Sequence, residues 1–82
     1  MTERSPAVSL QRLLDDLCRE WGFCARLRAA DLLRPDAVLG AGDFAGVVLR
    51  AEGMDPETEK RWVRRIADRF TERFGPSGLA CG

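Results

Sequence analysis

The sequence predicts an all-α fold, a small compact bundle of four to five helices. Apolar side chains recur at helical spacing in two long stretches, and each stretch lies between a helix-capping residue and a glycine. No stretch shows a convincing strand pattern, and 82 residues suffice for one domain. We expect one helical domain over residues 1–75 and a flexible C-terminal tail over residues 76–82. The expected helices cover approximately residues 6–21, 28–34, 41–52 and 55–74.

The first helix has clear start and stop signals. Ser5 is a suitable N-cap and Pro6 suits the first helical position, although Ser9 is a competing cap. Gly22 follows the last apolar residue and is typical of a helix end, with Phe23 placed to fold back on the last turn. The apolar residues form a single stripe and are Leu10, Leu13, Leu14, Leu17, Cys18 and Trp21.

The middle of the chain contains one short pattern twice. Residues 27–32 and 39–44 both read L-x-A-x-D followed by an apolar residue. Each copy predicts a helix start, with two apolar residues forming a hydrophobic staple and the aspartate near the positive end of the helix dipole. Pro35 keeps the first of these helices short, because proline disfavours helical geometry at the residue before it.

The last helix is predicted to begin at Asp55, with Pro56 at its first position and Glu57 in its first turn. Gly75 and Pro76 end it. Its apolar stripe consists of Trp62, Val63, Ile66, Ala67, Phe70 and Phe74.

Charge and cysteine usage restrict the class of protein. Lys and Arg total 13 and so do Asp and Glu, so the chain lacks the cationic excess that bulk capture of nucleic acid or an anionic membrane requires. The start, MTERSPAVSL, lacks the apolar run of a signal peptide, and no run approaches the roughly 20 residues that span a bilayer. Cys18, Cys24 and Cys81 are odd in number and form no CxxC motif, which favours a reducing compartment. We therefore expect a cytoplasmic protein with Cys18 in the core and Cys24 and Cys81 as free thiols.

The sequence offers no recognisable catalytic, metal-binding or cofactor-binding residues. It contains neither His nor Tyr, and its cysteines lack the close spacing of zinc ligands. Gly40, Gly42 and Gly46 spell GxGxxxG, but a phosphate-cradling turn needs a βαβ unit of about 30 residues, and a capped helix follows instead. We therefore expect the protein to be non-enzymatic.

The segment LRAEGMDPETEKRWVRR resembles the turn and second helix of a helix-turn-helix, with Gly53 in the turn and Trp62 as a core anchor. The resemblance implies a DNA-binding transcriptional regulator with a helix-turn-helix-like unit at residues 42–74. Leu49 and Glu59 depart from the pattern, because a small residue and a buried aliphatic residue are expected there. The side chains that would face the major groove are Glu57, Thr58, Lys60 and Arg61.

The basic residues of the last helix do not form a purely cationic surface. At about 100° per residue, Lys60, Arg61, Arg64 and Arg65 share the face opposite Trp62, but acidic side chains lie among them. Those acidic residues are Glu57, Asp68 and Glu72. Such a mixed face is usually only solvated, so nucleic acid is a possible partner and not the favoured one.

A protein-interaction module is the favoured interpretation: a small non-enzymatic adaptor, regulator or subunit that uses a helical surface. Aromatic side chains are numerous for so small a core, and Trp, Phe and Arg are suited to interface anchors. We expect the rings of Trp21 and Phe23 to point in different directions, which would leave one exposed. The alternative is that every ring simply packs in the core. The candidate residues for a protein partner or for self-association are Trp21, Phe23, Arg61, Arg64 and Arg65.

Overall fold

Helices make up most of the regular structure, which confirms the predicted helical class. The computed structural model describes residues 5–24, 26–34 and 36–80. Its elements in chain order are α1 (Pro6–Trp21), α2 (Ala29–Leu32), β1 (Val38–Leu39), α3 (Ala41–Ala51), α4 (Lys60–Phe74) and β2 (Leu79–Ala80). The radius of gyration of 12.1 Å is close to that of a compact domain of this length.

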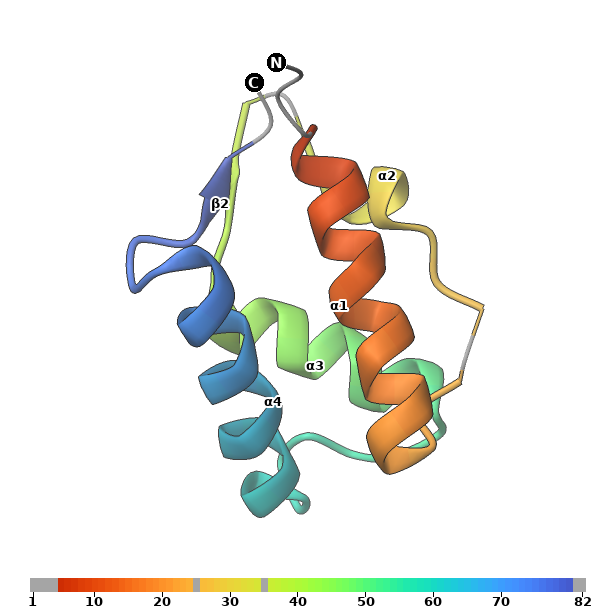
Figure 1. Ribbon diagram of the computed structural model, residues 1–82. Coiled ribbons are helices and arrows are strands. Elements are labelled where there is room, and N and C mark those ends of the chain that lie inside the picture. The colour runs from red at the N-terminus through yellow and green to blue at the C-terminus, as the bar shows by residue number, and fades with distance from the viewer. Residues whose placement is uncertain (1–4, 25, 35, 81–82) are drawn as a thin grey trace.

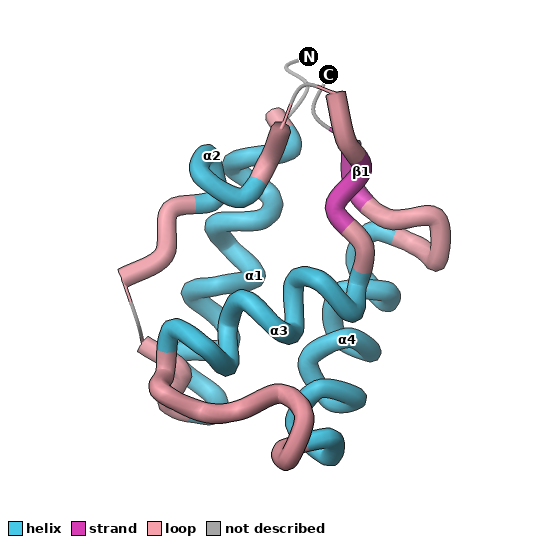
Figure 2. Tube along the Cα trace, turned by 180° about the vertical axis from the view of Figure 1, so that it is seen from behind, coloured by secondary structure: helices cyan, strands magenta, loops and turns pink. Residues whose placement is uncertain are grey.

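The three longer helices form two layers. In Figure 1, α1 and α4 lie in front and run in opposite directions, and α3 crosses behind them. Figure 2 shows the same arrangement from behind, with α3 nearest the viewer. Phe44 of α3 and Phe70 of α4 are fully buried, with ring centroids 5.1 Å apart. The core therefore lies where α3 meets the inner faces of α1 and α4. Its buried residues are Leu10, Leu13, Leu14, Leu17, Ala29, Phe44, Ala45, Val48, Leu49, Ile66 and Phe70.

Helix α1 has the bounds that its sequence predicts. The hydroxyl of Ser5 accepts a hydrogen bond from the Val8 amide at 3.2 Å, so Ser5 and not Ser9 is the cap. At the other end, Gly22 has a φ of 77°, a left-handed conformation that glycine adopts without strain. The Gly22 amide donates to the Cys18 carbonyl at 3.0 Å and the Phe23 amide to the Leu17 carbonyl at 3.3 Å, which is a helix-terminating turn.

Helix α4 begins at Lys60 and not at residue 55, so the predicted start is wrong. The Asp55 carboxylate does act as a cap and accepts from the Glu57 amide at 2.9 Å, but the turn it caps is a separate one. The Asp55 carbonyl then accepts from the amides of Thr58 and Glu59, at 3.1 and 2.9 Å. Glu59 has a φ of −99° and a ψ of 51°, which are not helical angles, so this turn does not continue into α4.

The C-terminal segment pairs with β1, whereas the sequence predicts a flexible tail over residues 76–82. Leu79 and Ala80 form an antiparallel pair with β1, with Val38 opposite Ala80 and Leu39 opposite Leu79. Gly78 makes this approach possible, because a Cβ atom there would lie 2.7 Å from the Leu39 carbonyl oxygen. Strands of two residues carry no detectable alternation of apolar and polar side chains, which explains why the sequence does not predict the pair. Residues 81–82 lie outside the described part.

Helix α2 is shorter than the predicted 28–34, a single turn of four residues. It is attached to α1 by Gln11, whose Oε1 accepts from the Ala29 amide at 3.0 Å. None of the helices in the described part is both long and apolar enough to cross a bilayer.

Candidate protein-interaction surface

Three aromatic side chains meet where the end of α1 approaches the start of α4. Trp21 ends α1, Phe23 follows it, and Trp62 lies in the first turn of α4. Their ring centroids are 6.4 Å apart for Trp21 and Phe23, 5.5 Å for Trp21 and Trp62, and 5.0 Å for Phe23 and Trp62. All three contacts are edge-to-face, a favoured geometry for aromatic pairs. We call these three residues the aromatic cluster.

The expectation that the rings of Trp21 and Phe23 diverge is wrong, because both lie against Trp62. The left-handed Gly22 between them reverses the chain and returns Phe23 toward the helix that it follows. Both side chains are half-buried, as is Trp62. The cluster therefore packs against the core and also keeps part of its surface in contact with solvent.

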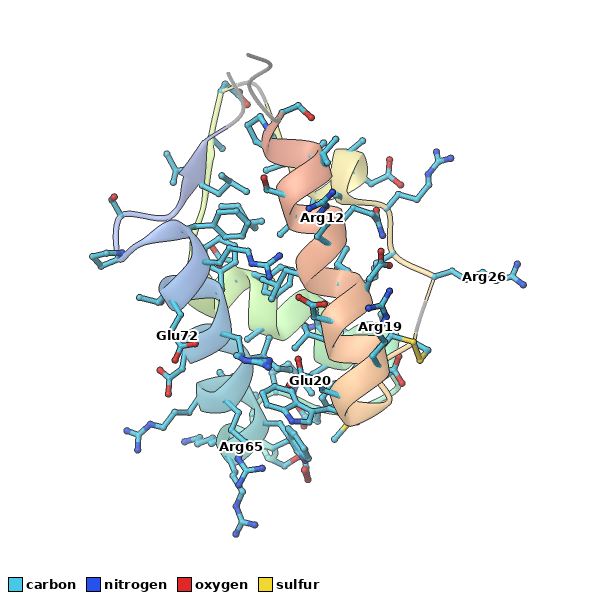
Figure 3. All side chains as sticks on the ribbon, in the orientation of Figure 1. Arg12, Arg19, Glu20, Arg26, Arg65 and Glu72 are labelled. Carbon is cyan, nitrogen blue, oxygen red and sulfur yellow. A yellow bond between two sulfur atoms is a disulfide. The ribbon has the colours of Figure 1, made fainter. Side chains whose placement is uncertain are left out.

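Two arginines of α4 lie over the cluster. The guanidinium carbon of Arg65 is 5.3 Å from the centre of the Trp62 ring, and that of Arg69 is 5.0 Å from the centre of the Trp21 ring. Both distances suit a cation–π contact. Arg69 also makes a two-pronged ion pair with Glu20 of α1, with Nη1 3.1 Å from Oε2. Figure 3 shows Arg65 at the same end of the molecule as Glu20.

The cations of α4 fall into two groups. Arg69 and Arg73 are paired to α1, since Arg73 contacts Asp16 at 2.9 Å and Arg69 contacts Glu20. Lys60, Arg61, Arg64 and Arg65 are exposed, and none of them takes part in the ion pairs found within the described residues. These four residues line one shallow hollow together with Asp68. We call the four the basic face.

The acidic residues near the basic face lie differently from the expected arrangement. Glu57 lies in the capped turn before α4, and Glu59 immediately precedes the helix. Asp68 is therefore the acidic side chain in the hollow that the basic face lines. The structure thus places the predicted interaction residues in two groups: Trp21 and Phe23 in the aromatic cluster, and Arg61, Arg64 and Arg65 on the basic face. Trp62 connects them, because it contacts Trp21 and Phe23 on one side and Arg65 on the other.

A disulfide between Cys18 and Cys24 closes the loop beside the cluster, which corrects the prediction of a core thiol and a free surface thiol. The turn at Gly22 brings the two Cα atoms to 4.4 Å, and that proximity could not be seen from a spacing of six residues. Cys18 is half-buried and Cys24 is exposed. The pairing also removes the cysteine argument for a reducing compartment. Cys81, predicted to be a free thiol, lies outside the described residues.

Elsewhere, a hollow of about 690 Å³ lies between α1 and α4. Its lining residues are Ser9, Arg12, Asp15, Asp16, Arg19, Arg73 and Phe74. Charges of both signs line it and Arg73 already neutralises Asp16, so it presents no surface of a single sign to a ligand. Groups of three or more Cys, Asp or Glu side chains that could hold a metal ion do not occur in the described part of the chain.

The glycines of the GxGxxxG motif belong to helix α3, with Gly40 at its N-cap and Gly42 and Gly46 inside it. Gly40 precedes α3, and its carbonyl accepts the Phe44 amide at 2.9 Å. The strand before it pairs antiparallel with β2, whereas a phosphate-binding βαβ unit requires a parallel strand.

The geometry of residues 42–74 departs from a helix-turn-helix. The connection between α3 and α4 covers residues 52–59 and includes the capped turn, whereas the motif has a turn of about three or four residues. Glu57 and Thr58, expected at the start of a groove-reading helix, lie in this connection. No protein family, curated protein or solved structure matches the chain.

Sequence reasoning missed Trp62 and Arg69 as parts of this surface. The helical stripe places Trp62 in the core, yet Arg65 three residues later is at the spacing at which neighbouring side chains of a helix touch. Arg69 gives no comparable signal, because its partners Glu20 and Trp21 lie on another helix.

Proposed function

We propose that the protein is a small, non-enzymatic protein-interaction module, an adaptor, regulator or subunit, which binds an acidic segment of a partner protein. The binding surface consists of the aromatic cluster and the basic face. The observation that carries the proposal is the contact between them: the guanidinium carbon of Arg65 lies 5.3 Å from the centre of the half-buried Trp62 ring, and Arg65 belongs to a face of four exposed cations that have no ion-pair partner within the described residues.

The composition of the surface supports binding to protein. Tryptophan and arginine are the residue types that most often contribute large binding energies at protein interfaces. The rings are already held by their mutual contacts and by Arg69, so little side-chain freedom is lost when a partner covers them. A partner can therefore gain from the exposed parts of these rings at a small entropic cost.

Charge complementarity supports an acidic partner. Lys60, Arg61 and Arg64 extend into solvent at no ion-pairing distance from a carboxylate of the described residues, and Arg65 contacts a ring. Carboxylates brought by a partner would meet four cations with one acidic side chain, Asp68, in the same hollow, whereas Arg69 and Arg73 are already ion-paired. Apolar side chains on the same segment would contact Trp62.

We place this function in the cytoplasm. In that compartment disulfides are usually transient, so the Cys18–Cys24 pair would exchange with the thiol pool.

Peptide display tests the proposal and requires no identified partner. A random library of peptides of about 16 residues is selected on the immobilised full chain, and in parallel on the Arg61→Glu/Arg64→Glu variant. We expect enriched peptides that combine Asp or Glu with an aromatic or aliphatic anchor, and that bind the wild-type chain and not the variant. Enrichment of basic peptides, or equal binding to both proteins, would contradict the proposal.

Two competing outcomes are measured beside the selection. A DNA-binding regulator would be retained by a random duplex with a steep salt dependence, weakened by Arg61→Ala and Arg64→Ala. Self-association would make the apparent molecular mass of the pure chain, measured by sedimentation equilibrium, increase with its concentration. The proposal predicts neither retention on the duplex at physiological salt nor a dimer that Trp62→Ala dissociates.

A further inference from the structure

We propose that the Cys18–Cys24 disulfide is a redox switch that holds the aromatic cluster in its assembled form. The conformational part of this inference depends on the fold alone. Its consequence for partner binding rests on the proposed function above. In the oxidised chain the cluster is assembled; in the reduced chain Phe23 leaves Trp62.

The disulfide encloses the segment that presents two of the three rings. Trp21 and Phe23 both lie between Cys18 and Cys24, so the disulfide makes this segment a covalently closed loop. Phe23 is a loop residue, and after reduction it is held only by non-covalent contacts: the hydrogen bond from its amide to the Leu17 carbonyl, the two tryptophan rings and its packing against the core. Trp21 is held in addition by α1 and Arg69. Reduction should therefore release Phe23 and leave Trp21 in place.

The accessibility of the sulfur atoms suits exchange with a thiol. Cys24 is exposed and Cys18 is half-buried, and Figure 3 shows the disulfide at the edge of the molecule beside the lower end of α1. A cellular dithiol is the co-reactant. Its thiolate attacks Sγ of Cys24, the S–S bond breaks, and the electron pair leaves on Sγ of Cys18, which takes up a proton. The second thiolate of the dithiol then attacks the mixed disulfide and releases Cys24, which is protonated in turn. Two electrons pass to the protein, and the dithiol becomes a disulfide.

The first experiment follows the switch without any partner. The full chain carries Cys81→Ser, so that the third cysteine cannot exchange, and is prepared oxidised and then reduced with dithiothreitol. Alkylation and intact mass should show no reactive thiol before reduction and two after it. Near-ultraviolet circular dichroism then reports the cluster, since both tryptophans of the chain belong to it. We expect the tryptophan signal, taken apart from the contribution of the disulfide itself, to fall on reduction, with the far-ultraviolet helix signal unchanged.

Two variants of the same chain act as controls. Cys18→Ser/Cys24→Ser should show the reduced spectrum at once and should not respond to dithiothreitol. Phe23→Leu keeps the disulfide but lacks the moving ring, so its aromatic signal should respond little to reduction. Two thiols in the oxidised preparation, an aromatic signal unaffected by reduction, or loss of the helix signal would each overturn the switch. The last result would identify the bond as a structural link instead.

The binding arm separates this inference from the proposed function. A peptide selected by display is titrated against the oxidised and the reduced chain by fluorescence anisotropy. We expect affinity to fall about fivefold on reduction, because a smaller fraction of molecules has the cluster assembled. Equal affinity in both states would overturn the regulatory role. Failure to select any acidic peptide would refute the proposed function, while the spectra would still decide the switch.

Discussion

The two halves of α4 carry the same kinds of side chain and use them differently. The second half buries Phe70 completely, and its cations Arg69 and Arg73 contact carboxylates of α1. The first half has a half-buried Trp62 and four exposed cations with no ion pair in the described residues.

This difference separates the side chains of α4 that stabilise the fold from those that remain available to a partner. In the second half of α4, the buried rings and the paired arginines are satisfied within the molecule. In the first half, the ring and the charges are only partly used, and Arg65 contacts an aromatic face without an acidic partner among the described residues. Arginine and aromatic residues alternate along the whole of α4, but only those of the second half find ion-pair partners on α1. The arginines of the first half, which have no such partner among the described residues, form part of the proposed surface.

The largest expected effect comes from Phe70, which is fully buried between Phe44 and Phe74. Phe70→Ala should lower the free energy of unfolding by about 4 kcal/mol, and Trp62→Ala by about 2 kcal/mol, because Trp62 is only half-buried. Urea denaturation followed by far-ultraviolet circular dichroism measures both losses. Since a domain of this size has little stability in reserve, Phe70→Leu provides a milder variant that should still fold. Equal losses for Phe70 and Trp62 would erase the distinction between the two halves.

Removing the disulfide should have the next largest effect. Cys18→Ser/Cys24→Ser should lower the free energy of unfolding by about 2 kcal/mol, because the short loop it closes loses its restraint in the unfolded chain. The same urea titration measures it, with Cys81→Ser as the matched cysteine control. A double variant as stable as the wild-type chain would mean that the loop is held by the cap at Gly22 alone.

Arginines from the two halves can be compared directly. Arg69→Met should cost about 1 kcal/mol, since it removes both the ion pair with Glu20 and the contact with Trp21. Arg65→Met should cost less than about 0.5 kcal/mol, because it removes only the contact with Trp62. Thermal unfolding of the two variants side by side is sufficient. The reverse order would show that the pairing seen for Arg69 contributes nothing.

The smallest expected change in stability belongs to the basic face. Arg61→Glu/Arg64→Glu should alter the free energy of unfolding by less than about 0.5 kcal/mol, because both side chains are exposed and outside the ion pairs of the described residues. Binding of a selected acidic peptide should nevertheless be abolished. The matched control is Arg12→Glu/Arg19→Glu, which makes the same change of charge at two exposed arginines of α1. Equal losses of binding in both variants would indicate a general effect of net charge.

Sequence reasoning succeeded where local chemistry decides the structure. The bounds of α1 follow from Ser5, Pro6 and Gly22, and the start of α3 follows from the staple pattern at residues 39–44. It failed where the structure depends on contacts or on backbone geometry that no short stretch of sequence specifies. The pairing of Leu79 and Ala80 with β1 has no local signal, and Asp55 signals a cap without showing that its turn stops before Lys60.

The candidate surface is predictable in its parts and not in its assembly. Residue type and helical phase identify Trp21, Phe23, Arg61, Arg64 and Arg65. The contacts of Trp62 with Trp21 and Phe23 require the start of α4 to lie beside the end of α1, which no single stretch encodes. The disulfide had one usable signal, because a left-handed glycine at a helix end returns the chain toward the preceding turn.

Chemical-shift mapping by NMR tests the central claim most directly. The labelled full chain is titrated with an acidic peptide selected by display. We predict that the two indole N–H signals and the amides of residues 21–23 and 60–65 shift together and saturate at one peptide per chain. Shifts centred instead on Ser9, Arg12 and Phe74, around the hollow between α1 and α4, would contradict the account.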